Sequence, residues 1–170
     1  MDLKTHNGYG VLQELYPYRE FTQTDLMWMR RSDEKPNVLS QKITDLEPGR
    51  TYIMSMKTGD YQDLINGTSV EKQHAVSIDI ENVEMINDWY RNEKYGSPNA
   101  TMYKAKTWRT VGPFNGENQY CINVHTRVFR AKGRTAKLVI SDWKQKDQPG
   151  APAGEELVLN NIEVKPYFSE

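Results

Sequence analysis

The strongest constraint on the fold is an alternation of apolar and polar residues with a period of two. In "HAVSIDIE" (74–81), Val76, Ile78 and Ile80 alternate with polar residues, and "YCINVHTRVFRA" (120–131) is a longer example. A strand with one buried face produces this alternation. Helical periodicity is weak throughout the chain. The sequence therefore predicts antiparallel strands separated by turns.

Turn signals separate further extended segments. "LEPGRTYIMSMK" and "FRAKGRTAKLVISDW" each place Gly-Arg-Thr just before an extended run, where Gly49 and Gly133 can take the positive φ that a tight turn requires. Pro48-Gly49 is also a type II turn signal. The segment 144–154, with two prolines and two glycines, predicts a loop. Other strands are expected at 26–31, 37–44, part of 107–114 and 157–166.

The best candidate for helix is 83–96, where Val83, Ile86 and Trp89 or Tyr90 would share one face. It predicts a short helix or a structured insert in a protein that is otherwise all-β. Eight or so strands favour a β-sandwich. A chain of 170 residues has the size of one domain, so we expect a single β-sandwich domain over 1–170, excised or not from a larger multidomain protein.

Three segments also carry a family resemblance. The first, 38–61, contains L-x-P-G-x-x-Y between Leu46 and Tyr52; the second is a hairpin at 127–143; the third is the closing strand "LNNIEV" (159–164). In this order they resemble the jelly-roll carbohydrate-binding modules of the galactose-binding-domain-like superfamily, which are often attached to carbohydrate-active enzymes. The resemblance implies an antiparallel jelly-roll β-sandwich.

The closing strand raises the question of calcium. Asn160 takes the position at which many modules of this family have an aspartate that binds a structural calcium, and Asn161 follows it. Two roles stay open: Asn160 is a calcium ligand, or both amides hydrogen-bond neighbouring loops. A neutral carbonyl is a weaker Ca²⁺ ligand than a carboxylate, which favours the second role. No other cofactor is expected.

The sequence contains no catalytic signature such as H-E-x-x-H or G-x-S-x-G. His6, His74 and His125 are far apart and have no companion at metal-ligand spacing. His125 lies on the polar phase of its strand with Cys121 and Asn123, but a Cys-His nucleophile pair would also need an orienting residue and an oxyanion hole. We therefore expect a buried or groove-lining histidine. An enzyme such as a small lyase or glycosidase is a third alternative, and it would need a cleft with two facing acids or a Tyr/His/Arg cluster.

Aromatic residues carry the best functional indication. The segment 88–108, "DWYRNEKYGSPNATMYKAKTW", mixes aromatic rings with charged and amide side chains. Sugars bind to flat aromatic faces surrounded by a few polar partners. The candidate ligand-binding residues are Trp89, Tyr90, Tyr95, Tyr103, Trp108 and Trp143. Trp108 and one of Trp89 or Tyr90 could instead plug the end of the sandwich, Trp143 could have either role, and Trp28 is expected in the core.

We therefore expect a non-catalytic carbohydrate-binding module that recognises a polysaccharide or oligosaccharide through surface aromatics. The resemblance implies a fused catalytic domain and an extracellular or periplasmic location. The alternative is a structural or protein-interaction sandwich with no sugar site. A net charge of −1, without blocks of like charge, does not favour nucleic acid as a partner. The chain also has no apolar stretch of about 20 residues, so no membrane span is predicted.

Overall fold

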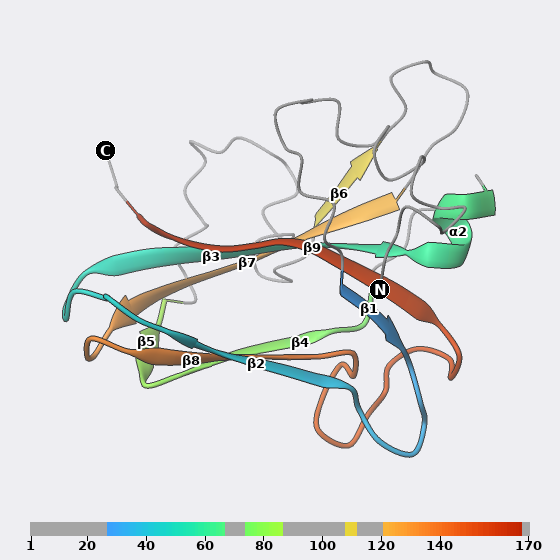
Figure 1. Ribbon diagram of the computed structural model, residues 1–170, viewed down its shortest axis with the longest axis horizontal. Coiled ribbons are helices and arrows are strands. Elements are labelled where there is room, and N and C mark those ends of the chain that lie inside the picture. Colours follow the sequence, from blue (N-terminus) through green and yellow to red (C-terminus); the bar gives the residue numbers. More distant parts are fainter. Residues whose placement is uncertain (1–26, 67–73, 87–107, 112–120, 168–170) are drawn as a thin grey trace.

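A computed structural model describes residues 27–66, 74–86, 108–111 and 121–167, which form two antiparallel sheets packed face to face (Figure 1). The larger, six-stranded sheet has the order β1-β9-β3-β7-β5, and β6 also pairs with β7. Its strands are β1 (Met27–Arg30), β3 (Thr51–Asp60), β5 (Val83–Met85), β6 (Trp108–Val111), β7 (Cys121–Ala131) and β9 (Glu156–Pro166). The all-β sandwich expected from the sequence is confirmed at this level.

The smaller sheet has three strands in the order β2-β8-β4. They are β2 (Val38–Ile43), β4 (Ser77–Glu81) and β8 (Ala136–Ser141). The described residues also include one short helix, α2 (Tyr61–Asn66). No helix among them is long and apolar enough to cross a membrane.

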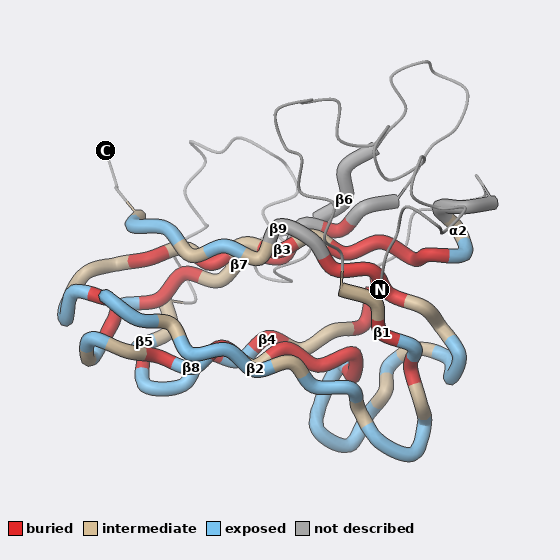
Figure 2. The backbone as a smooth tube through the Cα atoms, in the orientation of Figure 1, coloured by how far each residue is buried: buried red, intermediate tan, exposed pale blue. Residues whose placement is uncertain are grey.

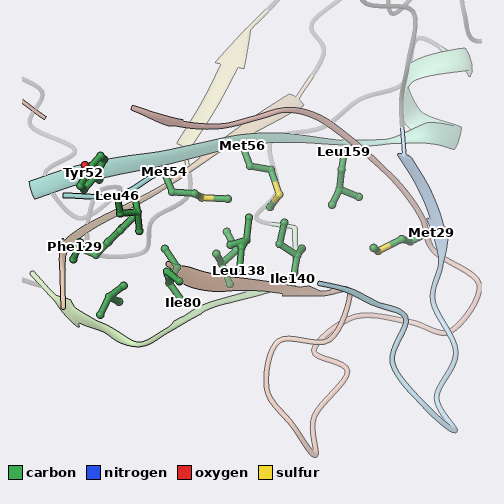
Figure 3. Close-up of a cluster of buried hydrophobic side chains, with 14 of the residues drawn as sticks. Met29, Leu46, Tyr52, Met54, Met56, Ile80, Phe129, Leu138, Ile140 and Leu159 are labelled. Carbon is green, nitrogen blue, oxygen red and sulfur yellow. The ribbon is translucent and has the colours of Figure 1, made fainter. Parts of the chain in front are cut away.

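The hydrophobic core lies between the two sheets (Figures 2 and 3). Alternate residues of β3 point into it: Met54 and Met56 are fully buried, whereas Ser55 between them is only half-buried. In β4, Ile78 and Ile80 are buried and the intervening Asp79 is exposed, as the alternation predicted. Burial of one face per strand supplies most of the stabilising free energy.

The L-x-P-G-x-x-Y segment forms one closed turn. Gly49 has φ +83°, and the Arg50 N–H donates to the Glu47 carbonyl over 3.1 Å, which is the type II turn expected from Pro48-Gly49. The Tyr52 hydroxyl accepts a 2.8 Å hydrogen bond from the Glu47 N–H, and its ring stacks on Phe129 with centroids 5.7 Å apart. The tyrosine therefore holds both the turn and the core.

Two local details differ from what the sequence suggested. Gly133 does not take positive φ; Asn82 does, with φ 63°, and its amide donates to the Thr135 carbonyl. The predicted helix at 83–96 begins as strand β5, because its first residues pair with β7 from Ala131 to Phe129. The remainder of that segment from residue 87 lies outside the described residues.

The paired asparagines lie beside a β-bulge in β9. Lys57 of β3 is opposite Asn160, whereas Ser55 is opposite Glu163, so two residues of β9 face the single residue Met56. The buried phase changes at this point: Leu157 and Leu159 face the core before it, and Ile162 and Val164 pack against the core after it. The asparagine doublet thus lies where the strand needs an extra residue to keep its apolar side chains inside.

Candidate functional site on the outer face of the larger sheet

The side of the larger sheet that faces away from the core collects several predicted residues in one row. Trp108 of β6 pairs with Val124 of β7, Val124 pairs with Lys57 of β3, and Lys57 pairs with Asn160 of β9. Residues directly opposite each other in an antiparallel ladder belong to the same face. Two of the predicted site residues, Trp108 and Asn160, therefore share a row that crosses four strands.

Polar side chains lie next to this row. Ser55 and Thr126 are opposite each other, and the Ser55 hydroxyl donates to Glu163 Oε1 over 3.0 Å. Glu163 Oε2 also pairs with Lys165 Nζ at 2.8 Å. We call the set Ser55, Lys57, Gly59, Thr126 and Glu163 the outer-face site. It offers hydroxyl, carboxylate and ammonium groups, the chemistry that sugar hydroxyls require.

Lys57 is the central charge of the outer-face site. Burial lowers the pKa of Lys57, and the negative charge of Glu163 opposes that shift. The side chain is close to half-buried, so the ammonium group has lost part of its water shell. An ammonium group with three donors in such a position gains from hydrogen bonds to ligand oxygens.

The residues just before the predicted aromatic segment 88–108, and Trp108 at its end, bind to the same strand, β7. Before the segment, Met85 pairs with Phe129 and the Ile86 N–H donates to the Val128 carbonyl over 2.9 Å; at its end, Trp108 pairs with Val124. These attachment points are five residues apart on β7, or roughly 17 Å. Of the predicted ligand-binding residues, Trp89, Tyr90, Tyr95 and Tyr103 lie outside the described residues.

Trp28 corrects one expectation. It pairs with Val158 and lies on the outer side of the larger sheet, half-buried, whereas its neighbours Met27 and Met29 pack with the core. Gly59 is the next residue in the same row. The sequence missed this position because "LMWM" is apolar in both phases and so does not indicate which phase is buried. Trp28 on β1 and the backbone position of Trp108 on β6 therefore lie at opposite margins of the larger sheet.

Trp143 lies elsewhere, just after β8. It is 8% exposed, and its indole N–H donates to the Ser32 carbonyl over 2.8 Å. The neighbouring Asp142 is fully buried and accepts hydrogen bonds from the backbone and side-chain amides of Asn37 at 2.8 and 2.6 Å. Of the two roles open to Trp143, this environment favours packing.

The histidine singled out in the sequence is buried. His125 and Asn123 are each 1% exposed and face the core, so here the polar phase of the strand is the inner one. Thr58 Oγ1 lies 2.7 Å from His125 Nε2 and 2.8 Å from His74 Nδ1, and the His74 N–H donates to Asn123 Oδ1 over 2.7 Å. We call Thr58, His74, Asn123 and His125 the buried polar junction. Its burial keeps a substrate from reaching His125.

The register also bears on calcium. Lys57 lies directly opposite Asn160, and its positive charge opposes the binding of a cation there. In the described part of the chain, no three His, Cys, Asp or Glu side chains converge as metal ligands would. The position of Lys57 opposite Asn160 thus disfavours a cation there.

Comparisons with known proteins add no relative. The scan against family models, the search of curated proteins and the search of solved structures each found no match to this chain.

Proposed function

We propose that this protein is a non-catalytic carbohydrate-binding module, of the jelly-roll type that the sequence resembles. It binds a polysaccharide or oligosaccharide at the outer-face site and at aromatic residues beside it. It acts next to a fused catalytic domain in an extracellular or periplasmic protein. The ligand lies across the strands, with sugar rings against aromatic faces and hydroxyls against Lys57, Ser55 and Glu163.

The row from Trp108 through Lys57 to Asn160 is the single observation that supports this proposal most. It joins an aromatic position to a half-buried cation and an amide position across neighbouring strands. The predicted aromatic segment is attached to β7 at the end of the same row. Polar groups that converge beside aromatic residues are the usual chemistry of saccharide sites.

The runner-up function, a structural or protein-interaction domain without a sugar site, draws support from the burial of Trp143. Two-layer sandwiches serve either function, so the fold does not separate them. A measurement of saccharide binding separates the two functions.

Affinity gel electrophoresis with a panel of neutral and acidic polysaccharides provides the test. We expect at least one polysaccharide to retard the wild-type protein, with EDTA having no effect. With that polysaccharide, Trp108→Ala and Lys57→Met should each weaken binding about tenfold or more, because each removes a direct contact. Lys137→Met is the matched control: it removes an exposed lysine, paired with Glu81, from the smaller sheet.

Retardation of the wild-type protein by none of the polysaccharides would overturn the proposal and leave the runner-up. Equal binding by the wild-type protein, Trp108→Ala and Lys57→Met would also overturn the assignment of the site. Loss of binding in EDTA would restore calcium as a component.

A further inference from the structure

We propose that the buried polar junction is an acid-sensitive latch, which holds the chain entering β4 against the larger sheet and releases it when the histidines gain protons. His74 lies in the chain just before β4, whereas Thr58, Asn123 and His125 belong to β3 and β7. The contacts of the junction at 2.7 to 2.8 Å therefore tie a segment that leads into the smaller sheet to the larger one.

The hydroxyl of Thr58 makes the junction sensitive to protons. It has one proton to donate, and it lies within hydrogen-bond distance of two imidazole nitrogens. It can donate only to a ring nitrogen that carries no proton. If both rings were protonated, the hydroxyl would lose this acceptor, and two cations would lie on either side of one hydroxyl in a site shielded from water.

The described residues around His125 offer little compensation for a positive charge on its ring. The other inward residues of β4, β8 and β9 around His125 are apolar. Within the described residues, the titratable and charged groups on the elements packed around it include His74, Arg127, Asp60 at the end of β3, Asp142 after β8, and Arg31, which donates to the Ala75 carbonyl. Asp60 Oδ1 accepts from the Asp63 N–H at the start of α2, and Asp142 accepts from Asn37.

The direction of the effect follows from proton linkage. Burial, followed by the charges of His74 and Arg127, lowers the pKa of His125 from 6.5 to about 3. The closed latch therefore holds a neutral ring, whereas an opened, hydrated ring takes up a proton near its ordinary pKa of 6.5. Opening is then favoured about tenfold more for each pH unit below 6.5, down to about pH 3. Above pH 6.5 the latch is fully stable.

Amide hydrogen exchange measured by NMR tests the latch directly, because the His74 N–H is itself one of its hydrogen bonds. We expect the protection factor of this amide, corrected for the intrinsic exchange rate, to fall about tenfold per pH unit below 6.5. The Gly49 N–H, which donates to the Ala131 carbonyl in a separate turn, is the reference and should keep its protection. His125→Gln should flatten the pH dependence at His74, and Thr58→Ser, which keeps the hydroxyl, should preserve it.

Parallel loss of protection at His74 and Gly49 would overturn the latch, since it would mean that the whole molecule unfolds in acid. Protection at His74 that does not change between pH 7 and 4 would overturn it equally. The wild-type measurement decides the matter even if His125→Gln fails to fold.

Discussion

At the scale of single residues, Tyr52 shows how one side chain can serve both a turn and the core. Its ring stacks on Phe129, and its hydroxyl accepts a hydrogen bond from the Glu47 backbone. The turn it stabilises lies against a second one, because the Leu46 N–H donates to the Arg134 carbonyl. The two Gly-Arg-Thr segments that the sequence singled out are thus neighbours in space.

This arrangement predicts that removal of the Tyr52 hydroxyl oxygen lowers the free energy of unfolding by a measurable amount. Tyr52→Phe keeps the stacked ring and removes the acceptor of the Glu47 N–H, so we expect the free energy of unfolding to fall by about 1 kcal/mol. Urea denaturation measures it. Ser55→Ala is the control: it removes a solvent-exposed hydrogen bond to Glu163, so the free energy of unfolding should change by less than about 0.5 kcal/mol. An equal, negligible loss in both variants would refute the structural role of the Tyr52 hydroxyl.

Residue type alone could not place His125 or Trp28. The alternation in β7 is clear, but both of its phases are buried where they can be compared: Val128 is 1% exposed on one side and Phe129 is fully buried on the other. The phase of β7 that contains His125 and Phe129 is mostly polar, so the sequence alone suggests that it faces solvent. Only the partner strand shows that it faces the core. The sequence therefore indicated the strand correctly and could not indicate which side faced the core.

At the scale of secondary-structure elements, the bulge in β9 coincides with the Asn160-Asn161 doublet of the sequence. The apolar residues run from 157 to 159 and then stand at 162 and 164, and the core-facing positions change from odd to even numbers across Asn160-Asn161. A bulge accommodates one extra residue without turning the later side chains outward. Asparagine, which is disfavoured in a regular ladder, is tolerated where the ladder is interrupted.

The bulge leads to an unusual expectation for a deletion. Removing Asn161 leaves Ile162 opposite Met56 and keeps every later residue of β9 on its present face, so the variant should fold with a melting temperature within a few degrees of the wild type. Removing Ser55 from β3, which pairs with strands on both sides, turns part of that strand over and should abolish folding. Circular dichroism melts compare the two. Unfolding of the Asn161 deletion would show that the bulge is not the register device described here.

Strands and turns were thus largely predictable, because they depend on local alternation and turn residues. The loop at 144–154 and the strand segments near 26–31, 37–44 and 157–166 all agree with the sequence. The helix predicted at 83–96 failed at its start because Val83 and Met85 also fit a strand of period two, and pairing with β7 decided between the two patterns. Such pairing between distant segments is not visible in a local window.

The edge strand β4 is also protected against association with further strands, and the sequence alone does not show this. Arg127 of β7 reaches across to the smaller sheet and donates to the Ile78 carbonyl over 3.3 Å, and it donates to the Thr126 carbonyl over 2.9 Å. It thereby occupies a backbone carbonyl of β4, an edge strand of the three-stranded sheet. Charged side chains at strand edges oppose association with further strands.

At the scale of the whole molecule, the two sheets differ in character. The outward residues of the smaller sheet include the exposed Ser40, Lys42, Asp79 and Glu81, and Val38 is the exposed large hydrophobic residue of the described chain, at 57%. The larger sheet carries half-buried polar side chains between tryptophans at its margins. A ligand would gain more from the larger sheet, because partly desolvated groups form stronger hydrogen bonds.

The most direct test of the proposed function is to map the ligand onto the sheets. ¹⁵N-labelled protein is titrated with an oligosaccharide of whichever polysaccharide retards it, and the backbone amide shifts are followed. We expect the largest changes at 55–59 in β3, at 108–111 in β6 and around Asn160 in β9, with β2 and β4 unaffected. Changes confined to the smaller sheet, or none at saturating oligosaccharide, would contradict a saccharide site on the outer face of the larger sheet.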